Sequence, residues 1–190
     1  MRLPTHIETE RLLLRPPALG DAPAIYETYA RDPEVTRYLI WRPHRSLADT
    51  EEFLRAHLAR RVADADDAAA QGSVEVSAEV SWVLILKEGD QLAGMLAVHP
   101  AEFRVGLGYV LGRAYWGRGL MTEAVRAVTE LALAQPEVFR VWAVCDVDNR
   151  ASARVLEKAG LAREGVLRRW SLHPNVSAAP RDCLCYAKVR

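Results

Sequence analysis

The sequence has little cysteine, no long apolar run and no net charge, and each shortage excludes a class of protein. Three cysteines in 190 residues are too few, and too unevenly spaced, for a disulfide framework. The densest apolar run, Trp82 to Leu86, is far too short to cross a bilayer. Lysine plus arginine equals aspartate plus glutamate at 25 each, so net charge gives no reason to expect nucleic acid or an anionic membrane as a partner.

The bulk composition is typical of one globular domain. Half of the residues are apolar and 26% are charged. A chain of this length can build one core, so we expect residues 1–190 to form a single domain, as a monomer or a homodimer. The first residues, Met1 to His6, have no apolar stretch after their charge, which predicts a cytoplasmic protein without a secretory signal.

Residues that could bind a metal are not grouped in the sequence. No set of histidines and cysteines has the spacing of a metal site, so we predict none. Cys183 and Cys185 alternate with other residues in a strand-like stretch and should face the same side. We interpret both as small apolar side chains in reduced surroundings.

The apolar pattern predicts elements in the order β-α-α-β-β-β-α-β-α-β-β. The expected strands are 7–15, 80–87, 92–98, 103–111, 140–145, 161–170 and 183–189, and the expected helices are 18–29, one beginning at Ser46, 119–134 and 149–159. The short gaps between the three central strands indicate antiparallel hairpins. We therefore predict an α/β (α+β) fold, with a mixed, mostly antiparallel central sheet flanked by helices.

The most informative segment is Tyr109 to Thr122, YVLGRAYWGRGLMT, in which a strand leads through glycines into a helix. Gly117 and Gly119 let main-chain N–H groups approach a ligand without a Cβ in the way. The first turn of the helix adds unpaired N–H donors and a partial positive charge. Together they predict an anion site suited to a pyrophosphate, to which Arg113 and Arg118 could add charge.

The glycines alone are compatible with other interpretations. A tight turn without a ligand is equally compatible with the glycines alone. A dinucleotide site starting at Gly106 and Gly108 fits poorly, because the third glycine, Gly112, comes one place late and the run lies inside a strand. A Walker loop is excluded, since no Gly-Lys-Ser/Thr is present.

The run Trp116 to Ala124, WGRGLMTEA, resembles the central pyrophosphate-binding motif of the GNAT superfamily of N-acyltransferases. It is most similar to the branch that acetylates the N-termini of ribosomal proteins. The chain departs from the superfamily pattern at Ala114, where a Gln or Arg is usual. The resemblance implies an acetyl-CoA-dependent N-acetyltransferase, with acetyl-CoA bound at Tyr109, Val110, Leu111, Gly117, Arg118, Gly119, Leu120, Met121, Thr122 and Asn149.

A second stretch, Asp148 to Leu161, resembles the same branch almost residue for residue. From the residues alone, Ser152 would be a small core serine and Asn149 a helix N-cap. The resemblance implies instead that Asn149 contacts the pantetheine arm and that Ser152 hydrogen-bonds the leaving thiolate. Leu156 stands where many other members have a tyrosine as general acid, which favours Ser152 for that catalytic role.

The resemblance implies direct attack of a neutral amine on the thioester in a ternary complex, without a covalent enzyme intermediate. Cys145 is therefore expected in the core. The glutamate that the related branch often carries as general base is replaced by Gly106. Glu102 is our tentative choice for the base, with Asp146 and His99 as alternatives, although each of the three also fits a solvated surface group.

The missing glutamate bears on the choice of acceptor. Up to about a sixth of a peptide α-amine is neutral at pH 7, against about 0.04% of a lysine side chain. We therefore expect a protein or peptide N-terminal α-amine as acceptor, bound near Tyr38, Trp41 and His173, although Tyr38 and Trp41 could equally be buried anchors. A small-molecule amine, or an acyl-CoA-binding sensor without activity, remain the alternatives.

Overall fold

One eight-stranded sheet runs through the computed structural model, which describes residues 1, 3–70 and 79–190. The strand order is β1-β2-β3-β4-β5-β6-β8-β7, and every neighbouring pair is antiparallel except β5 and β6. The strands are β1 (Ile7–Glu8), β2 (Leu12–Arg15), β3 (Val80–Leu86), β4 (Leu92–Ala101), β5 (Arg104–Leu111), β6 (Arg140–Asp146), β7 (Ala162–Ser171) and β8 (Arg181–Val189). The helices are α1 (Ala22–Ile25), α2 (Pro33–Thr36), α3 (Leu47–Ala70), α4 (Leu120–Leu133) and α5 (Arg150–Lys158).

The predicted mixed sheet with flanking helices is confirmed, and the start of the chain differs in detail. The strand expected over 7–15 is two short strands, because the chain turns at Thr9, whose N–H donates to the carbonyl of Leu12 at 2.9 Å. The turn pairs Ile7 with Leu14 and buries both side chains. The helix expected over 18–29 is divided into a 3-10 turn, α1 and a π-helical turn.

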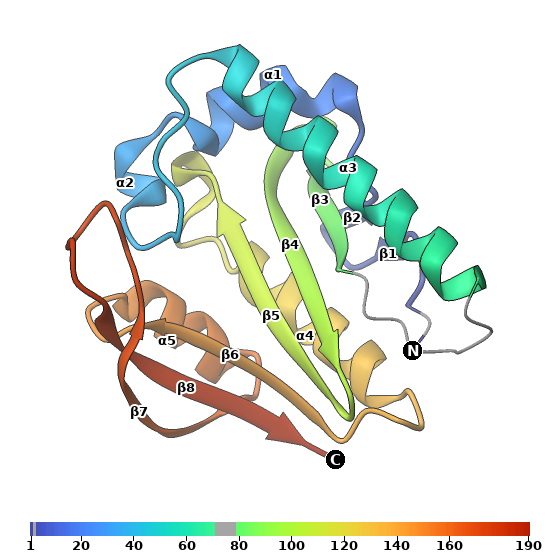
Figure 1. Cartoon of the computed structure of the whole chain (residues 1–190), viewed down its shortest axis with the longest axis vertical. Coiled ribbons are helices and arrows are strands. Elements are labelled where there is room, and N and C mark those ends of the chain that lie inside the picture. Colours follow the sequence, from blue (N-terminus) through green and yellow to red (C-terminus); the bar gives the residue numbers. More distant parts are fainter. Residues whose placement is uncertain (2, 71–78) are drawn as a thin grey trace.

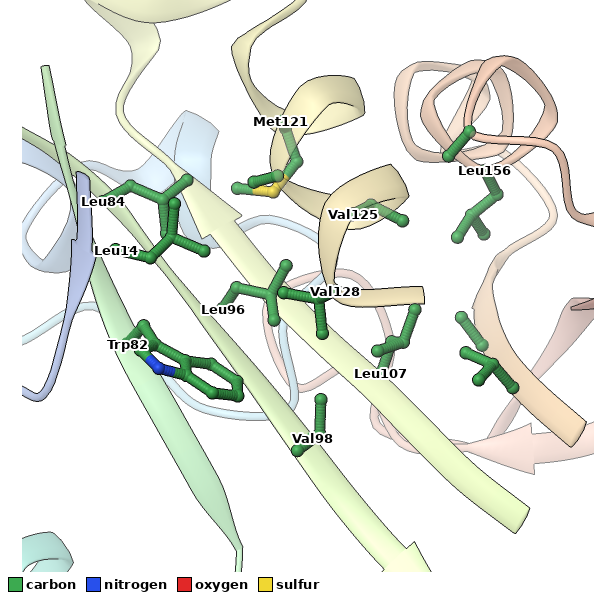
Figure 2. Packing of buried hydrophobic residues seen from close by; sticks show 14 of the residues in the cluster. Leu14, Trp82, Leu84, Leu96, Val98, Leu107, Met121, Val125, Val128 and Leu156 are labelled. Atoms are coloured by element: carbon green, nitrogen blue, oxygen red, sulfur yellow. The ribbon is translucent and has the colours of Figure 1, made fainter. Parts of the chain in front are cut away.

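Helices cover both faces of the sheet, and each face has its own apolar core (Figure 1). Figure 2 shows Val128 of α4 beside Leu96 and Leu107 of the sheet, and Met121 of the same helix directed toward Leu84. The opposite face packs against α1 and α3. In the part of the chain that the structure describes, no helix is both long and apolar enough to cross a membrane.

The strands β5 and β6 separate shortly after they begin (Figure 1). They pair only between Arg104 and Arg140, Val105 and Val141, and Gly106 and Trp142. Beyond Gly106, β5 continues beside β4, and β6 continues beside β8. The result is a splay in the sheet, between residues 107–111 of β5 and the end of β6, where the two strands make no ladder.

Candidate active site

The edge of β5 that borders the splay carries main-chain donors. Gly112 donates its N–H to the carbonyl of Ala93 in β4 at 2.8 Å. N–H groups along an antiparallel strand alternate between its two edges. This alternation directs the N–H of Val110 to β4 as well, and those of Tyr109 and Leu111 to the splay.

A side-chain contact supports the same alternation. The indole N–H of Trp116 donates to the carbonyl of Leu111 at 2.7 Å, so the main chain of Leu111 faces away from β4. Two of the three predicted main-chain donors, Tyr109 and Leu111, are thus turned toward the splay. The expectation that Val110 binds acetyl-CoA is corrected, because its N–H points to β4 and its side chain packs against the core under α1 and α3.

The glycine loop adopts the conformation that its sequence predicts. Gly117 and Gly119 have φ of 72° and 77°, the left-handed region in which glycine is favoured. Gly119 is the N-cap of α4, and the helix starts at Leu120. Leu120 and Met121 bury their side chains in the core, so they can offer a ligand only their first-turn N–H groups. The geometry is that of an anion site at a helix N-terminus.

The loop is held in place by an ion pair that the sequence analysis did not find. Arg11, in the β1–β2 turn, donates to Glu123 of α4 at 2.7 Å and to the carbonyl of Arg118 at 2.8 Å. The hydroxyl of Thr9 donates to Glu123 at 2.6 Å. Burial raises the pKa of Glu123, but the hydrogen bonds from Thr9 and Arg11 outweigh it and hold that pKa below its usual value. Glu123 lies within the WGRGLMTEA run, yet its partner is 112 residues away.

The two arginines of the loop differ in what they contact. The Nε of Arg113 lies 3.1 Å from a carboxylate oxygen of Asp32. Arg113 is therefore paired with a carboxylate of the protein, whereas the sequence suggested that it could add positive charge to the anion site. The guanidinium of Arg118 is exposed and lies 5.9 Å from the centre of the Tyr115 ring. Arg118 is the better placed of the two to reach an anion at the loop.

The side chains of Tyr109 and Ser152 meet on the α5 side of the splay. The hydroxyl oxygen of Tyr109 lies 2.7 Å from Oγ of Ser152, and either group can be the donor. Burial raises the pKa of Tyr109 although the hydrogen bond to Ser152 lowers it, so the phenol stays protonated. The side chain of Asn149 accepts the N–H of Ser152 at 3.1 Å and caps α5. The phenol of Tyr109 is a functional candidate that the sequence analysis missed, because nothing local marks a strand tyrosine as the partner of a helix serine.

The cysteines are buried in the protein. Cys145 belongs to the core under α4, and burial raises its pKa to about 11, so the thiol stays protonated and is not activated as a nucleophile. Cys183 and Cys185 are buried as well, as predicted. Among the residues that the structure describes, no group of three or more His, Cys, Asp or Glu is placed to hold a metal ion.

Neither of the two acidic candidates for the base is well placed for that role. Glu102 is in the turn between β4 and β5, seven residues from Tyr109, or about 23 Å along an extended strand. The expectation that Glu102 lies near the reacting atoms is therefore corrected. Asp146 is fully buried and accepts from Arg181 at 2.5 and 3.0 Å. Burial raises its pKa, but hydrogen bonds, first from Arg181, outweigh burial and lower it, so Asp146 is a structural carboxylate.

The two loops expected to bind the acceptor do come together, but not all of their side chains are available. Asn175 donates to the carbonyls of Thr36 and Trp41 at 2.7 and 2.8 Å. Trp41 packs partly buried on the core under α1 and α3, and Tyr38 is partly buried too. His173 is 5% exposed, with Nε2 3.8 Å from Asp146, so the expectation that it lines an open acceptor site is corrected.

The strand splay beside a glycine loop and a capped helix agrees with comparisons against known proteins. Residues 11–162 match the family model described as Acetyltransferase (GNAT) domain. The chain belongs to this family. Because it belongs to the GNAT family and its relatives include N-acetyltransferases, this GNAT protein is an acetyl-CoA-dependent N-acetyltransferase, as the sequence predicted.

Similar proteins include N-acetyltransferases of bacilli. The chain is 30% identical over 166 residues to YnaD of Bacillus subtilis and 28% identical over 163 residues to p20 of Bacillus licheniformis, with 86% and 84% of both chains covered, respectively. It is 28% identical over 109 residues to the ribosomal-protein-serine acetyltransferase of Escherichia coli, covering 56% of this chain and 59% of that protein.

Solved structures show the same fold over nearly the whole chain. A GNAT-family acetyltransferase from Bacillus anthracis superimposes with a TM-score of 0.77 at 25% identity, covering 97% of this chain and 98% of the other. RimL, an α-N-protein acetyltransferase of ribosomal L7/L12 solved with coenzyme A, superimposes with a TM-score of 0.75 at 19% identity, covering 97% of each chain.

Proposed function

We propose that this GNAT protein acetylates the α-amine at the N-terminus of a protein or peptide. The observation that carries the proposal is the splay itself, bordered by main-chain N–H groups on β5 and by the Tyr109–Ser152 hydroxyl pair. The acceptor class is supported by the partial match to a ribosomal-protein-serine acetyltransferase and by the structural likeness to RimL.

The geometry supports a specific binding site for acetyl-CoA in this proposal. The diphosphate would lie against the N–H groups that follow Gly117 and Gly119 at the start of α4. The pantetheine arm would run along the free edge of β5, toward the side chain of Asn149. The thioester carbonyl would then lie between the N–H groups of Tyr109 and Leu111, which are placed to stabilise charge developing on its oxygen.

Ser152 and Tyr109 would act on the leaving group. As the C–S bond breaks, negative charge develops on sulfur, and a protonated hydroxyl nearby lowers the energy of that state by a charge-assisted hydrogen bond. Tyr109 remains protonated across the working pH range because burial raises its pKa. In this proposal Ser152 contacts the sulfur and Tyr109 orients its hydroxyl.

The acceptor side of the splay favours an amine that needs little help to lose its proton. Gly106 and Gly108 leave that face of β5 without side chains, so β5 supplies no carboxylate there. About a sixth of an N-terminal α-amine is already neutral at pH 7, several hundred times the neutral fraction of a lysine side chain.

The proposal is tested by acetyl-CoA turnover against matched amines, followed by release of free thiol. One peptide carries a free α-amine and no lysine, and a second has the same sequence with a blocked N-terminus and one internal lysine. A small diamine represents small-molecule acceptors. We expect the first peptide to be acetylated at least tenfold faster across pH 6–9. Faster turnover of the lysine peptide or of the diamine would refute the α-amine assignment.

A further inference from the structure

The imidazole of His99 lies over the face of β5 that borders the splay. His99 pairs in register with Gly106 on the neighbouring strand, so the two positions share one face of the sheet. A Cβ built on Gly108 would lie 3.5 Å from Nε2 of His99, so this nitrogen lies in van der Waals range of the Gly108 position. The side chain is 53% exposed and thus open to an acceptor.

The opposite edge of this imidazole faces a carboxylate. Nδ1 of His99 lies 3.4 Å from one oxygen of Glu79, just before β3. The other oxygen of Glu79 lies 3.6 Å from Nδ1 of His57 on α3. His57 is almost fully buried, and its Nε2 lies 2.6 Å from the hydroxyl of Ser81. A chain of polar groups therefore runs from the core under α3 to His99.

The contacts favour one tautomer of His99. A carboxylate accepts hydrogen bonds and cannot donate them, so Glu79 favours a proton on Nδ1. In the neutral ring the lone pair is then on Nε2, the nitrogen directed at Gly108. Around the ring, the residue before β3 is Glu79, α3 contributes His57 through Glu79, and β5 contributes Gly106 and Gly108. This is the arrangement of a base held by an orienting carboxylate.

We propose that His99 is the general base of the acetyl transfer, oriented by Glu79, and that it acts from β4 in place of the glutamate missing at Gly106. The proposal rests on acetyl transfer at the splay, but not on which amine is the acceptor. Glycine at position 108 agrees with this role, because a side chain larger than alanine there would compete with the imidazole for the same face of β5.

The proposed step transfers one acetyl group and releases one proton. The amine nitrogen attacks the thioester carbonyl carbon from the α3 face, and a C–N bond forms. Nε2 of His99 takes the proton that the nitrogen loses and later passes it to water. The C–S bond breaks on the α5 face, where the thiolate of coenzyme A leaves beside Ser152 and is protonated from water after release. The two hydroxyls and the imidazole thus lie on opposite faces of the sheet.

The first test is His99→Gln, which keeps the size of the side chain but removes the titrating nitrogen. The assay uses the amine that wild-type protein acetylates fastest, so the test does not depend on the acceptor assignment. We expect kcat/KM to fall about 100-fold at pH 7, within the usual range for general-base catalysis. The deficit should shrink toward about tenfold at pH 9, where the free amine deprotonates without help. Coenzyme A affinity, measured by calorimetry, should stay within about twofold.

Two further variants separate a base from a structural histidine. His99→Ala should regain part of its activity when imidazole is added, because the bare site admits a free base. Gly106→Glu in the His99→Ala background should restore activity from the neighbouring strand. A Cβ at Gly106 would lie 3.5–3.6 Å from the Trp142 ring, which is ordinary contact. His6→Gln, at an exposed histidine, is the matched control and should behave as wild type.

Glu79 is a positioning residue in this scheme, and its test needs a readout beyond rate. Glu79→Gln should lower kcat several-fold while KM stays near the wild-type value, and Glu79→Asp should recover part of the lost kcat, because a carboxylate at this position orients the imidazole of His99. A His99→Gln variant with kcat/KM within threefold of wild type from pH 6.5 to 9 would overturn the proposal. Wild-type protein that turns over no peptide, but does acetylate a small amine, would refute the proposed acceptor and leave the test of His99 intact.

Discussion

The hydroxyl of Tyr109 on β5 lies 2.7 Å from Oγ of Ser152 on α5, and this contact joins the two sides of the splay. It connects a strand tyrosine, whose main-chain N–H faces the splay, with the helix that the Asn149 side chain caps. A group leaving from the splay would therefore meet two coupled hydroxyls.

Removing either hydroxyl should slow the chemical step more than it weakens donor binding. We expect Ser152→Ala to lower kcat by about 10- to 100-fold, and Tyr109→Phe by less, because the lost hydrogen bond is made to charge that develops in the transition state. The double variant should show a coupling energy of about 0.5–3 kcal/mol, typical of residues in contact. Tyr26→Phe removes an exposed hydroxyl that bonds to the Arg45 carbonyl and serves as control. Additive losses would argue against a coupled pair.

A side chain at Gly117 should strain the backbone of the glycine loop without contacting neighbouring atoms. A Cβ there would contact nothing within 4 Å, so the cost comes from φ of 72° and amounts to about 1–2 kcal/mol. We expect Gly117→Ala to weaken coenzyme A binding by about tenfold in calorimetry. Gly20→Ala, at a glycine with open space and no left-handed φ, should leave binding unchanged. Equal affinity in the two variants would show that the loop does not need this conformation.

The ion pair between Arg11 and Glu123 should stabilise the protein only while the carboxylate is charged. Glu123→Gln should lower the free energy of unfolding by about 1–3 kcal/mol at pH 7, a range typical of hydrogen bonds to a charged group. The folded pKa of Glu123 lies below its usual value of 4.5, so this contribution is complete above pH 4.5. It is lost as the pH falls through the lower folded pKa. Urea titrations at pH 7 and near pH 3 should show the gap between variant and wild type closing. A gap that is independent of pH would contradict the charge argument.

The buried carboxylate of Asp146 should be far more sensitive than its exposed neighbour. Asp146→Asn leaves Arg181 without its fully buried partner, and breaking such a pair costs about 3–5 kcal/mol. Asp148→Asn, whose side chain is 66% exposed, also loses a contact with Arg181, but water replaces it. Chemical denaturation of the two variants measures the difference. Similar losses in both would mean that Arg181 is held mainly by Asp148.

Local sequence patterns were sufficient for the main-chain geometry of the glycine loop and of the α5 cap. The glycines of the WGRGLMTEA run predicted the left-handed turns at Gly117 and Gly119 and the N–H groups at the start of α4. Asn149 predicted the cap of α5. These features involve residues within a few positions of one another, so propensity and spacing contain the information.

Side-chain partnerships across the sheet were decided by tertiary structure alone. Tyr109 and Ser152 are 43 residues apart, and Arg11 and Glu123 are 112 apart. Whether such residues meet depends on strand register, and a shift of one residue would turn each side chain to the other face. The same register carries Glu102 away from the splay and places His99 beside Gly106. The sequence thus determined the family, the order of elements and the glycine loop. Only the folded sheet decided which acids, bases and hydroxyls lie beside the splay, because long-range packing sets those distances.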